Sequence, residues 1–319
     1  MVVKLQPPDV IVLLMAEYSI GLDLGGTNLR AAAIDPDGKL IDRVAGNHTT
    51  HGASREAILS EMVDAISALR SRVGAHSLAG IGVSVPGFIS LKEGIIRNSN
   101  NLAPLENFPI RDELSRRLGA PVILENDANA AALGEKWIGA GRDVDDLVML
   151  TLGTGIGGGI ISKDRIIRGY LGMAGELGHI TVVPNGNPCG CGNRGCVEKH
   201  ASATAITAMA RLLGLGDGLS AKDVCDLAQS GNEKARQIFV SMGEALGIVL
   251  AMLVNTFNYP LYLVAGGVIG AWDLFAPPMI EETRRRSFTF RASQTRIEKA
   301  QLGNEAGLYG SAYLAWLKD

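Results

Sequence analysis

Residues 18–43 read YSIGLDLGGTNLRAAAIDPDGKLIDR, and this stretch decides the fold. Two apolar runs, 20–24 and 29–34, flank a turn rich in glycine and threonine, which predicts two strands joined by a hairpin. Pro36-Asp37-Gly38 is a second turn signal, because Gly38 accepts a positive φ. The stretch therefore predicts three antiparallel strands in succession.

The same design returns at residues 147–162, LVMLTLGTGIGGGIIS, so the chain contains a loose internal repeat. Around the two hairpins, strand patterns alternate with helical ones. An amphipathic helix is expected over about 54–72, where Glu56 lies in the first turn and Gly74 ends it. Further strands are expected at 80–87, 123–127 and 261–270. This alternation indicates an α/β fold with a mixed or parallel sheet.

Composition excludes several classes of protein. The chain has 319 residues, of which 47% are hydrophobic and 20% charged, a balance that argues against disorder. A net charge of −3 gives no electrostatic signature for binding nucleic acid or an anionic membrane. Four cysteines are too few for a disulfide scaffold, which favours a reducing cytoplasm. We find no signal peptide in the short apolar run 10–16, and no apolar run approaches the roughly 18 residues that span a bilayer.

The glycine turns suit a phosphate ligand. Backbone N–H groups that converge at a tight turn can surround phosphate oxygens, and glycine allows close approach. Thr27 and Thr154 add hydroxyl donors, Asp23 is placed to hold a hydrated Mg²⁺, and a third glycine pair follows at Gly266-Gly267. Ordinary β-hairpins are the alternative for each turn alone. Three such turns favour nucleotide binding, although the chain has neither a P-loop motif nor a GxGxxG turn that opens a helix.

Three of the four cysteines lie within GELGHITVVPNGNPCGCGNRGCVEKH, residues 175–200. His179, Cys189, Cys191 and Cys196 form a complete ligand set for tetrahedral Zn²⁺, which leaves no open position and so predicts a structural metal. A redox pair is the main alternative, but CxC differs from the CxxC arrangement of dithiol enzymes. Reduced surface thiols are the third alternative.

Asn126-Asp127 lies at the end of a predicted strand, directly before an alanine-rich helix. A carboxylate at this position could accept a proton from an attacking hydroxyl group. The alternative is that it caps the helix that follows, and spacing alone favours this second role.

Five segments occur in an order and spacing that resembles the ROK family of sugar kinases and sugar-responsive regulators, and within it the bacterial glucokinases. They are DLGGTNLR, LENDAN, LGTGIGGG, GELGH and CGCGNRGCVE, and the resemblance covers about 18–319. It implies an α/β, two-lobed, actin-like ATPase (ribonuclease H-like) fold with the ligand cleft between the lobes. It also implies ATP and Mg²⁺ as cofactors, a structural Zn²⁺ and a homodimer.

The resemblance further implies a division of the chain. Residues 1–17 would be an extension, 18–124 a small lobe, and 125–303 a large lobe that carries the zinc loop. The last helix, at about 304–319, would pack back onto the small lobe. We expect the hinge near Leu124–Glu125.

Residue roles follow from the matched motifs. Asp127 would be the base that acts on the 6-hydroxyl of a hexose, and Glu176, His179 and Glu198 would hold hydroxyls near its anomeric end. Gly87, Asn126 and Asp127 would also contact the sugar. The nucleotide and its metal would be held by Asp23, Gly25, Gly26, Thr27, Asn28, Thr154, Gly155, Gly266 and Gly267.

Three functions remain. The first is phosphorylation of glucose to glucose 6-phosphate, a cytoplasmic step of glycolysis and carbohydrate metabolism. The second is a kinase for N-acetylmannosamine or N-acetylglucosamine, since both kinds of sugar present the hydroxyls concerned. The third, a sugar-sensing transcription repressor, is disfavoured because about 17 residues before the first strand are too few for a DNA-binding domain. We therefore expect a small-molecule sugar as partner, and neither nucleic acid nor a membrane.

Overall fold

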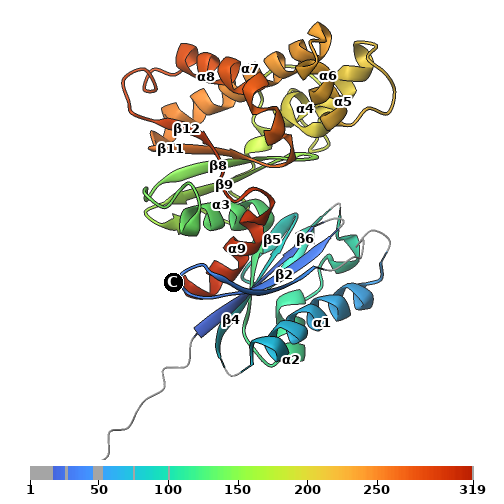
Figure 1. Ribbon diagram of the computed structural model, residues 1–319, viewed down its shortest axis with the longest axis vertical. Helices are drawn as coiled ribbons and strands as arrows, with labels where there is room; N and C mark the ends of the chain where they lie inside the picture. Colours follow the sequence, from blue (N-terminus) through green and yellow to red (C-terminus); the bar gives the residue numbers. More distant parts are fainter. Residues whose placement is uncertain (1–16, 26–27, 46–52, 75, 100, 318–319) are drawn as a thin grey trace, which may run out of the picture.

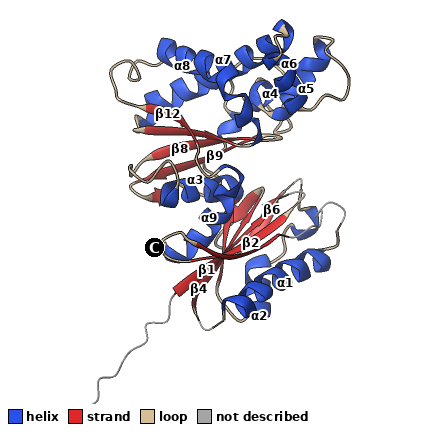
Figure 2. Cartoon of the chain, in the orientation of Figure 1, coloured by secondary structure: helices blue, strands red, loops and turns tan. Residues whose placement is uncertain are grey.

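The computed structural model describes residues 17–25, 28–45, 53–74, 76–99 and 101–317. Among these residues it has five stacked layers, visible from top to bottom in Figure 1: helices, a sheet, two helices, a second sheet and helices. Figure 2 shows the two sheets separated by the helices α3 (Asp127–Ile138) and α9 (Ala306–Tyr313). The chain is thus divided into two lobes that meet at these central helices.

The first sheet has the strand order β3-β2-β1-β4-β7. β1 and β2 form the predicted hairpin, β3 continues it antiparallel, and β4 and β7 add parallel strands. The strands are β1 (Glu17–Leu24), β2 (Leu29–Ile34), β3 (Leu40–Ala45), β4 (Ser77–Val85) and β7 (Val122–Asn126). A small hairpin of β5 (Phe88–Ser90) and β6 (Ile95–Asn98) follows β4.

The second sheet repeats this topology with the order β10-β9-β8-β11-β12. β8 and β9 form a hairpin, β10 extends it antiparallel, and β11 and β12 add parallel strands. The strands are β8 (Leu147–Leu152), β9 (Ile156–Ser162), β10 (Arg165–Ile166), β11 (Leu261–Ala265) and β12 (Arg296–Lys299). The internal repeat in the sequence therefore corresponds to two sheets with the same strand order.

Helices cover the outer faces of both sheets. α1 (Arg55–Val73) begins at Ser54, whose hydroxyl accepts a hydrogen bond from the Ala57 N–H, and ends at Gly74. Its predicted apolar face is buried against the first sheet, as is α2 (Ile110–Leu118). The second sheet is covered by α4 (Glu198–Ala201), α5 (Ala203–Leu212), α6 (Ala221–Gln229), α7 (Glu233–Phe257) and α8 (Trp272–Arg286).

α9 lies against both α3 and the first sheet, where it contacts β1, β2 and β4. At these contacts the backbones approach each other closely, because glycines lie between them. A Cβ atom at Gly82 would overlap the carbonyl group of Ser311, and one at Gly310 would overlap that of Ala130. Because small residues permit this approach, the final helix is wedged between the lobes. The first strand, β1, begins at Glu17, close to the predicted start of the small lobe at residue 18. The exact boundaries of the two lobes stay a prediction.

One described helix, α7, has 25 residues, and its most apolar stretch of 18 residues has a mean hydropathy of 1.9. By length and composition this helix could cross a membrane. Glu244 and Asn255 interrupt its apolar stretch, so this average does not contradict the expectation that no continuous apolar run approaches such a length. Moreover, 67% of the stretch is buried inside the protein, which is the behaviour of a core helix. The run 10–16 and the rest of the extension lie outside the described residues.

Candidate functional site

A cleft of about 750 Å³ lies between the lobes, and segments of both lobes line it. The first lobe contributes Gly87 and the β5–β6 hairpin, and the junction of β7 and α3 contributes 126–129. The second lobe contributes the β8–β9 turn, Gly172, residues 174–176, His179, Glu198 and Gly266. All six predicted sugar-contacting positions therefore line one cavity.

Asn126, not Asp127, caps α3. The Asn126 side-chain oxygen accepts hydrogen bonds from the N–H groups of Ala128 (2.9 Å) and Asn129 (3.1 Å), while its amide donates to the Gly87 carbonyl at 3.3 Å. Asp127 is the first residue of the helix, and its carboxylate accepts the Ala128 N–H at 2.9 Å. Because the neighbour carries out the capping, the Asp127 carboxylate remains available to the cleft.

The Asp127 carboxyl group has a pKa raised to about 6. Removal from bulk water deep between the lobes is the main cause, and the negative charge of Asp23 is the second. The side chain is nevertheless open to the cleft, so a ligand there can reach it. A carboxylate with this pKa is ionised at neutral pH and is a stronger base than an ordinary aspartate.

Asp23 is the second-last residue of β1 and is 8% exposed. Its carboxylate accepts hydrogen bonds from the Ser84 hydroxyl at 2.7 Å and from Arg30 at 2.5 Å, and Arg30 also reaches Glu305 at 3.4 Å. The turn that follows is closed by the Gly25 N–H, which donates to the Asn28 carbonyl at 2.9 Å. Gly26 and Thr27, two of the predicted nucleotide contacts, lie outside the described residues.

The second glycine turn lies on the cleft wall. The Gly153 N–H donates to the Gly155 carbonyl at 2.9 Å, and 153–158 line the cavity together with Gly266. Gly266 has φ 102°, and a Cβ atom there would overlap Leu152. Asp23, Gly25, Asn28 and Gly267 do not line this cavity, so among the described residues of the predicted nucleotide set Thr154, Gly155 and Gly266 are the ones on its wall.

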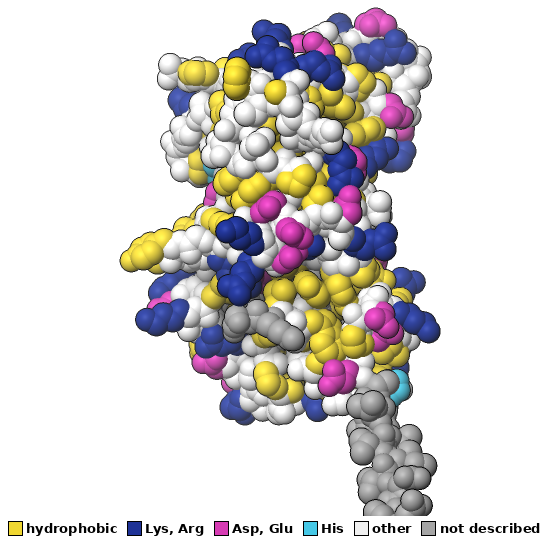
Figure 3. All heavy atoms as spheres, turned by 90° about the vertical axis from the view of Figure 1, so that its left-hand side faces the viewer, with side chains coloured by type: hydrophobic (Ala, Val, Ile, Leu, Met, Phe, Trp, Pro, Cys, Tyr) yellow, Lys and Arg dark blue, Asp and Glu magenta, His cyan; other side chains and the backbone are white. Residues whose placement is uncertain are grey.

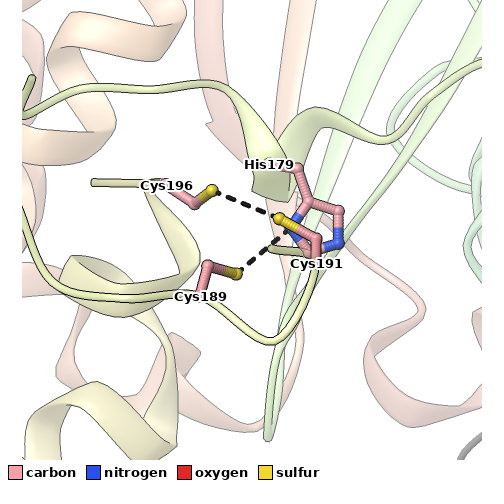
Figure 4. A group of neighbouring side chains, drawn as sticks. All are labelled: His179, Cys189, Cys191 and Cys196. Carbon is pink, nitrogen blue, oxygen red and sulfur yellow. Dashed lines mark hydrogen bonds between the residues drawn. The ribbon is translucent and has the colours of Figure 1, made fainter. Parts of the chain in front are cut away.

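The four predicted metal ligands converge (Figure 4). All their donor atoms lie within 4.8 Å of one another, with His179 Nδ1 3.6 Å from Cys189 Sγ and Cys191 Sγ 3.7 Å from Cys196 Sγ. Zinc–sulfur bonds of about 2.3 Å at tetrahedral angles separate two sulfurs by about 3.8 Å. The four cysteines of the chain are free thiols, and Cys225 is buried in α6, away from this group.

Glu176 and Glu198 lie at the two ends of the cysteine loop. The Glu198 carboxylate accepts the Ile156 N–H at 3.2 Å, which fixes it beside the glycine turn, and Cys189 Sγ lies 3.9 Å from its other oxygen. Glu176 Oε2 lies 3.8 Å from His179 Nε2, the ring nitrogen that faces away from the cysteines. Burial raises the pKa of Glu176, and the neighbouring His179 partly offsets that rise.

Three residues near the site were not predicted from the sequence: Glu125, Asn129 and Arg168. The Glu125 carboxylate is 2% exposed and accepts hydrogen bonds from Arg168 (2.7 Å) and from the Asn129 amide (3.1 Å). Asn129 itself lines the cleft. Arg168 and Glu125 are 43 residues apart, so no local pattern in the sequence indicates their contact.

Comparison with known proteins gives consistent matches. The ROK family profile matches residues 19–318. A glucokinase of Halalkalibacterium halodurans is 36% identical over 93% of this chain and 94% of its own. A xylose repressor of Caldicellulosiruptor bescii is 31% identical over 91% of this chain, but this match covers 76% of the repressor.

Solved structures agree with the fold. A ROK hexokinase from Thermus thermophilus superposes with a TM-score of 0.83 at 33% identity, over 94% of this chain and 98% of that one. A ROK glucokinase from Streptomyces griseus, solved with glucose and AMPPNP, superposes with a TM-score of 0.77 at 34% identity, over 94% and 99% of the two chains. The predicted two-lobed actin-like ATPase fold is therefore confirmed, and this chain belongs to the ROK family.

Proposed function

We propose that the protein is an ATP-dependent sugar kinase that transfers a phosphoryl group to the 6-hydroxyl of glucose, with Asp127 as the general base. The observation that carries this proposal is the placement of Asp127. Its carboxylate faces the cleft between the lobes with a pKa of about 6, and the capping of α3 does not occupy it. The named activities of the relatives support the same reaction.

Glucose would lie between Gly87 and Asn126 on one side and Glu176, His179 and Glu198 on the other. Carboxylates suit sugar hydroxyls because each accepts two hydrogen bonds and charged acceptors bind strongly. With the sugar held in this way, the 6-hydroxyl faces Asp127, which removes its proton as the oxygen attacks the terminal phosphate of ATP. Fixing both reactants in one cleft supplies much of the rate, because it replaces a bimolecular encounter by an oriented one.

Asp23 is the proposed residue for Mg²⁺. The mutual repulsion of Asp23 and Asp127, which helps to raise the pKa of Asp127, marks a place where a divalent cation would be stabilised. Mg²⁺ bound with ATP neutralises charge that develops on the transferred phosphoryl group. We place the nucleotide phosphates at the turns around Gly25 and Gly155, with Asn28, Thr154, Gly266 and Gly267 as further contacts.

We also propose a structural Zn²⁺ at His179, Cys189, Cys191 and Cys196. Their mutual distances fit a tetrahedral ion, and four protein ligands complete its coordination. Since His179 Nδ1 faces the thiols, its Nε2 atom remains directed toward the sugar side. The ion would hold Glu176 and Glu198 at a fixed separation.

The remaining assignments concern the setting of the enzyme. We propose a cytoplasmic homodimer that acts in glycolysis, without nucleic acid or membrane as partner. On the face shown in Figure 3, basic and acidic side chains are interspersed over both lobes, so this face has no continuous basic surface of the kind that binds nucleic acid. Light scattering after size-exclusion chromatography would measure the mass of the assembly.

An ADP-release assay with glucose, mannose, fructose, N-acetylglucosamine and N-acetylmannosamine tests the proposed reaction. We expect the highest kcat/KM with glucose. Phosphorylation of an acetylated sugar alone would overturn the choice of substrate, and no phosphorylation of any of them by zinc-replete protein would overturn the kinase. A repressor remains the alternative in that event.

A further inference from the structure

Arg168 forms hydrogen bonds with two segments that lie on different sides of the cleft. It follows β10, and its backbone carbonyl accepts a hydrogen bond from the Ala174 N–H at 3.1 Å, which closes the loop 168–174. Its side chain extends in another direction and donates from Nε to Glu125 Oε2 at 2.7 Å. The tip of the loop projects into solvent, since Tyr170 is 97% exposed. The loop is therefore fixed at its base.

Glu125 receives this contact near the end of β7, which is a strand of the first sheet. Its other oxygen accepts the Asn126 N–H at 3.0 Å and the Asn129 amide at 3.1 Å, so both oxygens are occupied. At 2% exposure the carboxylate is shielded from water, and among the described residues Arg168 is the cation paired with it. A buried charge of this kind requires its partner, because an unpaired one is strongly destabilised.

The positions of these contacts in the chain give them a functional meaning. Glu125 precedes Asp127 by two residues, and Ala174 precedes Glu176 by two residues. Through its side chain Arg168 therefore holds the segment that carries the proposed base. Through its backbone it holds the segment that carries a proposed sugar-binding carboxylate.

We propose that Arg168 is a positioning residue, which sets the separation between Asp127 and Glu176 and so orients the sugar toward the base. This inference rests on the proposed function, since it assigns to Arg168 the geometry of that reaction. Arg168 does not itself line the main cleft. It acts through Glu125 and Ala174, so its effect depends on the tie between the lobes and not on contact with the sugar.

Substitution of Arg168 should impair sugar use and leave nucleotide use largely intact. We expect Arg168→Met to lower kcat/KM for glucose about 100-fold, because displacements of about 1 Å can cost that much. The KM for ATP should change by less than about threefold, since the glycine turns are separate from this contact. Arg168→Lys should restore part of the loss, because it keeps the charge without the Nε geometry.

The double variant Glu125→Gln/Arg168→Met separates positioning from mere charge compensation. It removes the buried unpaired carboxylate, so its unfolding midpoint should recover toward that of the wild type, whereas kcat/KM for glucose should stay low. Arg284→Met is the matched control: Arg284 pairs with Glu281 at 2.7 Å on the exposed face of α8, far from the cleft. We expect this control to retain wild-type kinetics.

Kinetics, glucose affinity by calorimetry without nucleotide, and thermal unfolding should be measured for all variants. Wild-type kinetics in the double variant would overturn the proposal, as would an equal loss in Arg284→Met. If Arg168→Met fails to fold, the double variant still decides. A wild-type protein that phosphorylates no hexose contradicts the proposed function instead, and the stability coupling of Arg168 with Glu125 can be measured without it.

Discussion

At the scale of single residues, the division of roles between Asn126 and Asp127 explains how a helix start can also be a reaction site. Sequence alone favoured Asp127 as the cap, since aspartate is a preferred capping residue. In the structure Asn126 accepts the two N–H groups instead. Both residues are good caps, so the choice depends on backbone conformation at the strand end. A local pattern could locate the pair, but it could not assign the roles.

Asp127→Asn should lower kcat by about 10²- to 10⁴-fold, the usual contribution of a general base. The affinity for ATP should be retained, since the substitution preserves shape. Because the folded-state pKa is raised above the unfolded value, ionised Asp127 reduces stability as pH rises from about 4 toward about 6. The unfolding midpoint at pH 7 should therefore equal or exceed that of the wild type. A variant with nearly intact turnover would show that another group is the base.

The pH profile provides an independent measure of the same carboxylate. Below its pKa of about 6 Asp127 is protonated and cannot accept a proton, so kcat/KM should fall on the acid side with an apparent pKa near that value. The profile should be recorded with both Mg-ATP and glucose below their KM values, so that it reports the free enzyme, because a bound Mg²⁺ near Asp23 would lower the pKa of Asp127. An acid limb near pH 4, the range of an ordinary aspartate, would contradict the raised pKa.

At the scale of elements, the cysteine loop shows what spacing can predict. The sequence identified four candidate ligands, and the structure brings all four donor atoms together. The four ligands lie close together in the sequence, so closing one loop is enough to bring their donor atoms together. The tie between Arg168 and Glu125 joins two lobes across 43 residues, and for that reason sequence reasoning missed it.

Cys191→Ser should lose zinc and raise the Kd for glucose, while leaving the Kd for ATP unchanged. Without the ion, Glu176 and Glu198 are no longer held relative to each other, so sugar binding loses its preorganised contacts. Metal analysis and calorimetry measure the two effects. Cys225→Ser is the matched control, since Cys225 is buried in α6 outside the quartet and should keep both zinc and affinity. Active protein free of zinc would refute this account.

Gly310→Ala tests the packing of α9. Alanine is favoured over glycine in a helix by about 1 kcal/mol, but a Cβ atom here would overlap the Ala130 carbonyl. Backbone cannot rotate away as a side chain can, so we expect a net loss of about 1–3 kcal/mol in the free energy of unfolding, measured with urea. Gly270→Ala, where nothing lies within 4 Å of an added Cβ, should be close to neutral.

At the scale of the whole molecule, the duplicated strand order explains where the cleft lies. Each sheet contains an antiparallel hairpin at the place where the sequence repeat predicted one, and the turn of the second hairpin lines the cleft. The lobe contacts were harder to predict, because they depend on backbone-to-backbone approach at positions such as Gly82 and Gly310. A glycine in the sequence does not reveal whether it serves a turn or a helix contact.

Closure of the lobes should accompany sugar binding. Glucose would contact residues of both lobes, so the closed arrangement gains contacts that the open one lacks. Small-angle scattering should show a smaller radius of gyration with glucose than without it. The Glu176→Ala variant should show little change at the same glucose concentration. An identical radius in wild type with and without saturating glucose would contradict closure.

The position of α9 also has a consequence for the order of events in synthesis. β1 leaves the ribosome well before the helix that covers its inner face, because α9 follows it in the chain after all the strands of both sheets. N-terminal regions generally begin to fold first, yet here the first sheet lacks the cover of α9 until that helix has been made. Throughout that interval the growing chain exposes β1, β2 and β4 to other hydrophobic surfaces in the cell.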